Sequence, residues 1–193
     1  MNLSFRLACS QDAAALAAIY APYVENTSIT FEYEAPSAEE FERRIRKVTS
    51  RFPWIVCEDG GIPVGYAYAS AAFSRAAYQW DAELSVYLRS DYHRLGIASR
   101  MEDMISRLLR EQGYYHLYSL VTVPNEASIG FHKSKGFREA GIYHSTGFKL
   151  GDWHDVVILE KDLLPCIPGQ VPKFPIPLML LDGNFIEKVL EKI

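Results

Sequence analysis

The sequence is poor in cysteine and has none of the paired spacings that bind metals or form redox centres. Its 193 residues include only Cys9, Cys57 and Cys166, without C-x-x-C spacing and without a neighbouring metal-ligand pattern. We therefore expect three free thiols in a reducing compartment and no bound metal.

Long apolar runs and extended basic stripes are also missing. The longest late apolar run, Leu178 to Leu181, has four residues, far fewer than a bilayer span requires. The first ten residues contain polar Asn2, Ser4 and Arg6 and lack the apolar core of a signal peptide. The formal net charge is −4, whereas a nucleic acid backbone is bound by a basic surface. We expect a cytoplasmic protein that binds neither membrane nor nucleic acid.

The two best-known nucleotide motifs, G-x-x-x-x-G-K-[ST] and G-x-G-x-x-G, do not occur. Instead, an apolar strand from Ser85 runs into a basic turn around Gly96 that opens a long amphipathic helix, which we expect to end at Gly113. The first amides of a helix lack intrahelical partners and lie at the positive end of its dipole, so this turn is a candidate phosphate site. The small residues Gly96 and Ala98 allow an anion to approach the backbone.

Length and an apolar fraction of 49% predict one α/β domain with a substantial core. We expect helices capped by Ser10, Ser37 and Asn125, with Gly136 ending the third of these. Strands are predicted at Leu3–Leu7, Glu83–Leu88, Leu117–Val123, Phe137–Thr146 and Val156–Leu159, with a hairpin of Trp54–Cys57 and Val64–Ala71.

Composition changes after Leu164, where five prolines occur within 13 residues. Proline disfavours helix interiors and central strands, so an extended segment is predicted. A final helix capped by Asn184 would present an apolar face of Ile186, Val189, Leu190 and Ile193. We expect a domain at 1–164 and an extension at 165–193 that covers apolar surface of the same chain; a swapped dimer contact is the alternative.

Two segments resemble the GCN5-related N-acetyltransferase (GNAT) superfamily. His93-Arg94-Leu95-Gly96-Ile97-Ala98 resembles its acetyl-coenzyme A loop, Q/R-x-x-G-x-G/A, with His93 where Gln or Arg is usual. The stretch from Asn125 to Phe137 resembles the N-x-x-S/A-x-x-x-[YH]-x-x-x-G-F helix that follows the fifth strand in that superfamily. Both occur in the family's order and separation.

Two further segments, Trp80–Tyr87 and Gly147–Val156, resemble the phosphinothricin and methionine sulfoximine N-acetyltransferase branch, and the likeness runs from Phe5 to about Leu163. It implies a mixed, mostly antiparallel sheet with helices on both faces, splayed between the fourth and fifth strands. It also implies acetyl-CoA as cosubstrate and a small amino-acid-like amine as acceptor. We expect a homodimer.

Acetyl transfer to an amine needs a base for the amine, stabilisation of the thioester oxygen and protonation of the leaving thiolate. Glu83, in an apolar strand before the cofactor loop, is the expected base; a carboxylate that only binds the cationic amine is the alternative. The resemblance implies that a backbone N–H of Val86, Tyr87 or Leu88 meets the thioester oxygen.

Other contacts are likewise implied by the resemblance. His132, where many relatives carry Tyr, is expected to protonate the thiolate, and His154 to handle a second proton or to bind an oxyanion of the acceptor. Cofactor contacts are expected at Val86, Tyr87, Leu88, Arg94, Leu95, Gly96, Ile97, Ala98, Ser99, Asn125 and Ser128. Acceptor contacts are expected at Phe31, Arg75, Tyr78, Glu83 and Trp153, with Arg75 on a carboxylate. Phe73 departs from the herbicide-detoxifying members, which carry Lys near this position.

Two other functions fit the same sequence. The fold could act on a protein N-terminus or a polyamine, which requires an open, acidic groove. A noncatalytic acetyl-CoA sensor is the other reading, and the presence of Glu83, His132 and His154 disfavours it.

Overall fold

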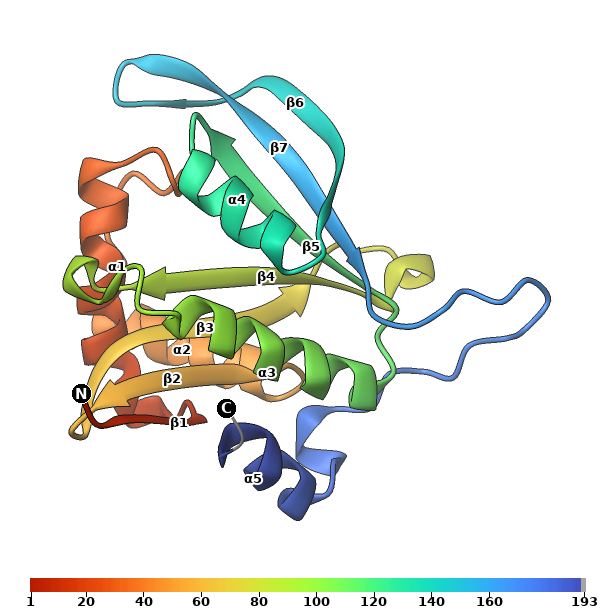
Figure 1. The fold of residues 1–193 in the computed structure, drawn as a ribbon. Coiled ribbons are helices and arrows are strands. Elements are labelled where there is room, and N and C mark those ends of the chain that lie inside the picture. Colours follow the sequence, from red (N-terminus) through yellow and green to blue (C-terminus); the bar gives the residue numbers. More distant parts are fainter. Residues whose placement is uncertain (192–193) are drawn as a thin grey trace.

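The computed structural model describes residues 1–191, which form a seven-stranded sheet with helices on both faces (Figure 1). The strands are β1 (Leu3–Leu7), β2 (Trp54–Asp59), β3 (Ile62–Ala71), β4 (Asp81–Leu88), β5 (His116–Val123), β6 (Arg138–Lys149) and β7 (Asp152–Asp162). The helices are α1 (Ala13–Asn26), α2 (Ala38–Thr49), α3 (Ile97–Gln112), α4 (Glu126–Ser134) and α5 (Gly183–Glu191). The strand order is β1-β2-β3-β4-β5-β7-β6.

Side-chain alternation along the strands builds two cores, one on each face of the sheet. On β4, Ala82, Leu84 and Leu88 join the larger core beneath α3. On β3, Tyr66 points to the opposite face and packs in the core formed with α1 and α2. No helix in residues 1–191 combines the length and hydrophobicity needed to cross a membrane.

The sheet opens between β4 and β5. These two strands run parallel and pair only from Asp81 to Glu83 on one side and from His116 to Tyr118 on the other. Beyond that point β4 stays paired with β3 as far as Leu88, while β5 continues with β7 as far as Val123. All other strand pairs are antiparallel. The predicted fold, including the splay between the fourth and fifth strands, is therefore confirmed.

Most of the predicted helix ends are confirmed, but Ser10 does not cap α1. It lies in a 3-10 turn (Ser10–Asp12), and α1 begins after Asp12. Asp12 is fixed there because its carboxylate accepts two hydrogen bonds from Arg6, at 2.6 and 2.7 Å, and one from the Cys9 amide at 2.8 Å. That charged contact between distant segments decides where the helix starts.

The β6–β7 hairpin is longer than the sequence pattern indicated. The strands extend to Lys149 and from Asp152, joined by Leu150 and Gly151 with φ of 54° and 86°. Because both turn residues are left-handed, the strands continue to the tip of the hairpin. The alternation is weak there because much of β6 is exposed to solvent.

The chain after β7 crosses the α3 side of the molecule and ends in α5 beside β1 and α3 (Figure 1). Leu178 and Val189 are buried in the larger core. Asn184 does not cap α5; its amide instead donates to the Asp182 carboxylate at 2.9 Å, upstream of the helix. Of the predicted apolar face, Ile193 lies outside the described residues.

Candidate active site

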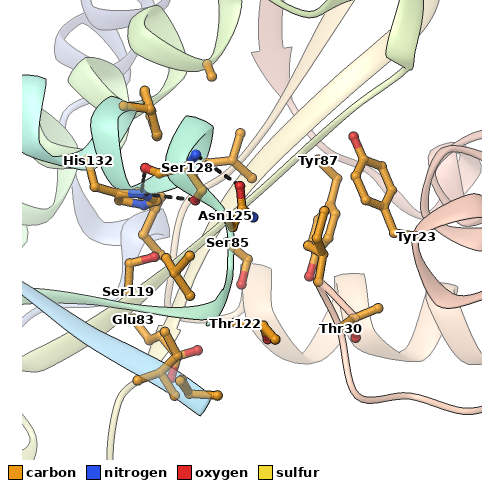
Figure 2. A pocket seen from close by; sticks show the side chains of 18 of the residues that line it. Tyr23, Thr30, Glu83, Ser85, Tyr87, Ser119, Thr122, Asn125, Ser128 and His132 are labelled. Carbon is orange, nitrogen blue, oxygen red and sulfur yellow. Dashed lines mark hydrogen bonds between the residues drawn. The ribbon is translucent and has the colours of Figure 1, made fainter. Parts of the chain in front are cut away.

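A cavity of about 530 Å³ fills the opening between β4 and β5. Its walls come from β4, β5, the start of α4 and the loop after α1, so segments far apart in the sequence meet there (Figure 2). The polar lining side chains include Tyr23, Thr30, Glu83, Ser85, Ser119, Thr122, Asn125, Ser128 and His132.

Glu83 lies on β4 at the last pair before the two strands separate, opposite Tyr118 of β5. Burial raises the pKa of its carboxyl group above the ordinary value, and no charged partner offsets this effect. A carboxylate with a raised pKa is a stronger base, and a proton acceptor works best when its pKa approaches the operating pH. Glu83 therefore has the environment of a general base.

The backbone of β4 presents amides to the cavity. The Arg89 amide donates to Val64 on β3 at 2.9 Å, and successive amides of a strand point to opposite sides. The amides of Leu88 and Val86 therefore point away from β3, into the splay, whereas that of Tyr87 points toward β3. Of the three amides expected to meet a thioester oxygen, Tyr87 is the one the geometry disfavours, although its side chain lines the cavity.

The start of α3 has the geometry of an anion site. Gly96 is the N-cap residue in a left-handed conformation, with φ of 77°, and Arg94 also has a positive φ of 62°. A Cβ placed on Gly96 would meet no atom within 4 Å, so the space in front of the first amides of α3 is open. Ala98 lines the cavity, which connects the two features.

The other residues of this loop have distinct surroundings. Leu95 is exposed, whereas the Ile97 side chain is buried in the core, so only the Ile97 backbone faces the open end of the helix. The Ser99 hydroxyl accepts a hydrogen bond from Lys135 at 3.1 Å. That contact ties the start of α3 to the end of α4.

Tyr23 closes one side of the cavity. Its hydroxyl donates to the Leu88 carbonyl, lies 3.4 Å from the Leu88 amide and 3.0 Å from Nε2 of His93. The Leu88 amide is thus already near an acceptor, which leaves the amide of Val86 as the freer donor on this edge.

His132 is buried on α4, where Asn125 caps the helix through the Ser128 amide at 3.1 Å. The Nδ1 atom of His132 lies 2.8 Å from the Ser128 carbonyl, which can only accept, so Nδ1 carries the proton. Burial lowers the pKa of this imidazole despite the opposing effects of that hydrogen bond and of Glu102. Neutral His132 therefore has no proton on Nε2 to give to a thiolate.

The loop after α1 is tied to the β6–β7 hairpin at the end of the cavity. Lys149 donates to the Thr30 carbonyl at 2.6 Å, and the ring of Phe31, which lines the cavity, packs on Gly147. A Cβ on Gly147 would lie 2.2 to 2.6 Å from three atoms of that ring. Gly147 is therefore required by the position of Phe31.

Four expected site residues do not line this cavity. His154 lies against Phe31, with its Nε2 2.9 Å from the Lys149 carbonyl, and so supports the wall from behind. Trp153 is 61% exposed and packs on Phe148. Arg75 and Tyr78 lie in the β3–β4 loop, in a separate shallow hollow with Phe73. The ring of Phe73 contacts Tyr118, the partner of Glu83 in β5, so the loop borders the Glu83 end of the site.

Several lining residues were not anticipated, among them Tyr23, Thr30, Ser119 and Thr122. Polar residues at 119 and 122 interrupt an otherwise apolar strand, which is the signal that could have indicated the β5 wall. Nothing in the local sequence distinguishes Tyr23 and Thr30, because their position depends on how α1 packs on the sheet.

Comparisons with known proteins agree with this geometry. Residues 5–158 match the family model described as an acetyltransferase (GNAT) domain. The chain is 31% identical over 170 residues to a phosphinothricin N-acetyltransferase of Streptomyces viridochromogenes, covering 88% of this chain and 93% of the relative. It is 29% identical to a methionine sulfoximine/methionine sulfone acetyltransferase of Pseudomonas aeruginosa, covering 86% of this chain and 97% of that protein.

Solved structures give the same result. The phosphinothricin acetyltransferase of Sinorhizobium meliloti, crystallised with acetyl-CoA, superposes with a TM-score of 0.84 at 28% identity, covering 91% of this chain and 96% of that one. The family match spans most of the chain, and the curated relatives align over nearly their whole length. The chain belongs to the GNAT family of acetyltransferases.

Proposed function

We propose that this enzyme transfers the acetyl group of acetyl-CoA directly to the primary amine of a small amino-acid-like acceptor, of the methionine sulfoximine, methionine sulfone or phosphinothricin type. The observation that carries the proposal is Glu83, a buried carboxylate of raised pKa placed where β4 and β5 separate. The cavity that it lines extends to Ala98 in the first turn of α3.

The residues of the cleft fit the cosubstrate. The open amides after Gly96 would hold the diphosphate, because that helix end is electropositive and nothing obstructs it. The outward-facing edge of β4 at Val86 would pair with the amide-containing arm, and Asn125 and Ser128 would border it from α4.

In the proposed reaction Glu83 takes the proton of the acceptor ammonium, and the free amine attacks the thioester carbon. The N–C bond forms, the C–S bond breaks, and the thiolate leaves and takes a proton. The Val86 amide is the candidate donor to the oxygen on which charge develops. Because neutral His132 bears its proton on Nδ1, we assign the thiolate's proton to solvent in place of this side chain.

The preference for amino-acid-like acceptors rests on the relatives and on the charges of the acceptor end. Relatives at about 30% identity carry names that specify phosphinothricin and methionine sulfoximine. Arg75, on the exposed loop bordering Glu83, is the proposed partner of the acceptor carboxylate. Phe73 replaces the Lys of herbicide-detoxifying members, so we expect methionine sulfoximine or methionine sulfone to exceed phosphinothricin.

A thiol-release assay across free amino acids, methionine sulfoximine, methionine sulfone, phosphinothricin and polyamines tests the proposal. The Arg75→Ala variant should lose about ten- to a hundredfold in kcat/KM for methionine sulfoximine and little for a carboxylate-free amine of similar shape. Equal losses for both amines would remove Arg75 as the carboxylate partner. Preference for polyamines or for peptide N-termini would replace the acceptor class, and binding without turnover would identify a sensor.

We also propose that the chain is a homodimer. The β6–β7 hairpin exposes Tyr143, Phe148, Leu150 and Trp153, each between 45% and 63% accessible. A second copy would cover this apolar surface, since such patches on one hairpin mark association sites. Sedimentation of the wild-type chain and of Trp153→Ser checks this, and a monomer at all concentrations would contradict it.

A further inference from the structure

Asp81, His116 and Cys166 form a hydrogen-bonded series outside the Glu83 cavity. The Nδ1 atom of His116 lies 2.8 Å from the Asp81 carboxylate, and its Nε2 lies 3.6 Å from the Cys166 sulfur. A carboxylate accepts only, so Nδ1 carries the proton and Nε2 is left to accept from the thiol. This is the arrangement of a nucleophile, a base and a group that orients the base.

The tertiary structure fixes each member. Asp81 and His116 are paired partners in the one parallel pair of the described sheet, at the first residues of β4 and β5. His116 also pairs with Asp162 at the end of β7, and Cys166 follows four residues later. The Asp162 carboxylate is 3.8 Å from Nε2 and is engaged by Arg138 at 2.8 Å. It therefore adds negative charge that favours a protonated imidazole without replacing the thiol as its partner.

The sulfur borders a cavity of about 310 Å³. Its walls are mostly aromatic and aliphatic, with Trp80, Tyr115, Tyr118, Ile167 and Pro172 among them. The cavity is held open from the C-terminal segment, because Trp80 donates to the Lys173 carbonyl at 2.7 Å and stacks on Phe174. Such walls suit a small uncharged acyl or aromatic group.

The three side chains are also distinguished from two bland explanations. No cluster of His, Cys, Asp and Glu in residues 1–191 has the arrangement of metal ligands. Cys9, also exposed and free, provides an internal comparison, because no histidine contact to its sulfur accompanies it. The chain thus contains two accessible thiols that differ in whether an oriented imidazole lies beside them.

We propose that Asp81, His116 and Cys166 form a second nucleophilic centre that accepts a small apolar acyl group from an uncharged ester or thioester. The Cys166 thiol proton passes to Nε2 of His116, and the sulfur attacks the carbonyl carbon. The new S–C bond forms as the bond to the alkoxide or thiolate breaks, and the leaving group takes the proton from His116. The products are S-acylated Cys166 and the free alcohol or thiol.

The test uses 4-nitrophenyl acetate with the full-length protein at neutral pH. We expect a burst of nitrophenolate stoichiometric with the chain, and peptide mass spectrometry should place the acetyl group on Cys166. Cys166→Ser should abolish the burst, whereas Cys9→Ser should retain it. Acetyl transfer at the Glu83 site should be unchanged in both variants, which separates this centre from the proposed function.

The dependence on His116 is the decisive part. His116→Ala should slow labelling of Cys166 by about ten- to fiftyfold, because a thiol without a base is only a few per cent ionised at neutral pH. A folded His116→Ala variant with wild-type labelling would overturn the proposal. Labelling of Cys9 and Cys166 at equal rates in the wild-type chain would overturn it as well, and that comparison needs no substitution.

Discussion

Replacing Glu83 by glutamine separates the base from its shape. Gln keeps the size of the side chain but cannot accept the ammonium proton, and general-base catalysis contributes about 10²–10⁴ in rate. We expect kcat at neutral pH to fall by about that factor, equivalent to roughly 3–5 kcal/mol of transition-state free energy. Affinity for acetyl-CoA should stay within about threefold, because the phosphate and arm contacts lie on α3 and the far end of β4.

The pH dependence carries a sign that can be checked. Wild-type activity should rise with pH through the pKa of Glu83, at a higher pH than an ordinary glutamate would show, because burial raises that pKa. The Glu83→Gln variant should lack this limb and recover in part at high pH, where more acceptor amine is free. Thiol release measured from pH 5 to 9.5 tests both statements, with Glu111→Gln, an exposed carboxylate on α3, as the matched control.

Stability provides an independent readout of the same burial. A carboxyl group whose pKa is higher in the folded than in the unfolded chain favours folding when protonated, below its ordinary pKa of about 4.5, and that contribution is lost as pH rises through the folded value. Glu83→Gln should therefore be more stable than the wild type toward urea at pH 7 and lose that advantage near pH 4. Wild-type turnover at pH 7 in a folded Glu83→Gln variant would refute the assignment of Glu83 as base.

Three further changes test the cleft. Gly96→Asp should weaken acetyl-CoA binding by about 1–2 kcal/mol in calorimetry, since it places a negative charge at the end of α3 that should meet the diphosphate; Gly96→Asn, neutral and tolerant of the positive φ, is its control, and equal affinities of the two would contradict this location. Gly147→Ala should cost about 1–3 kcal/mol in urea unfolding and raise the acceptor KM because it collides with Phe31, whereas Gly141→Ala on the same strand, with its new Cβ 3.9 Å from a side-chain methyl group, should cost under about 0.5 kcal/mol. His132→Asn should lower kcat by less than about tenfold, and a hundredfold loss confined to the alkaline limb would restore His132 as an acid.

The sequence by itself determined the elements whose signals are local. Gly113 and Gly136 end helices because a left-handed residue is required there, and Asn125 caps α4 through its own side chain. The cofactor loop was equally readable, since a strand, a glycine and an amphipathic helix follow one another in the chain. Glu83 was identifiable as a lone charge in an apolar strand, and its motif gave the family.

Only the tertiary structure decided which of these residues share a cavity. His154, Trp153, Arg75 and Tyr78 lie in matching family segments, yet none lines the cavity that contains Glu83. Their positions depend on the length of the β6–β7 hairpin and the path of the β3–β4 loop, which arise from long-range packing. The same holds for Asp81, His116 and Cys166, separated by 35 and 50 residues and brought together by the pairing of β4, β5 and β7. Strand pairing joins residues through contacts between segments, and no local pattern encodes which segments will meet.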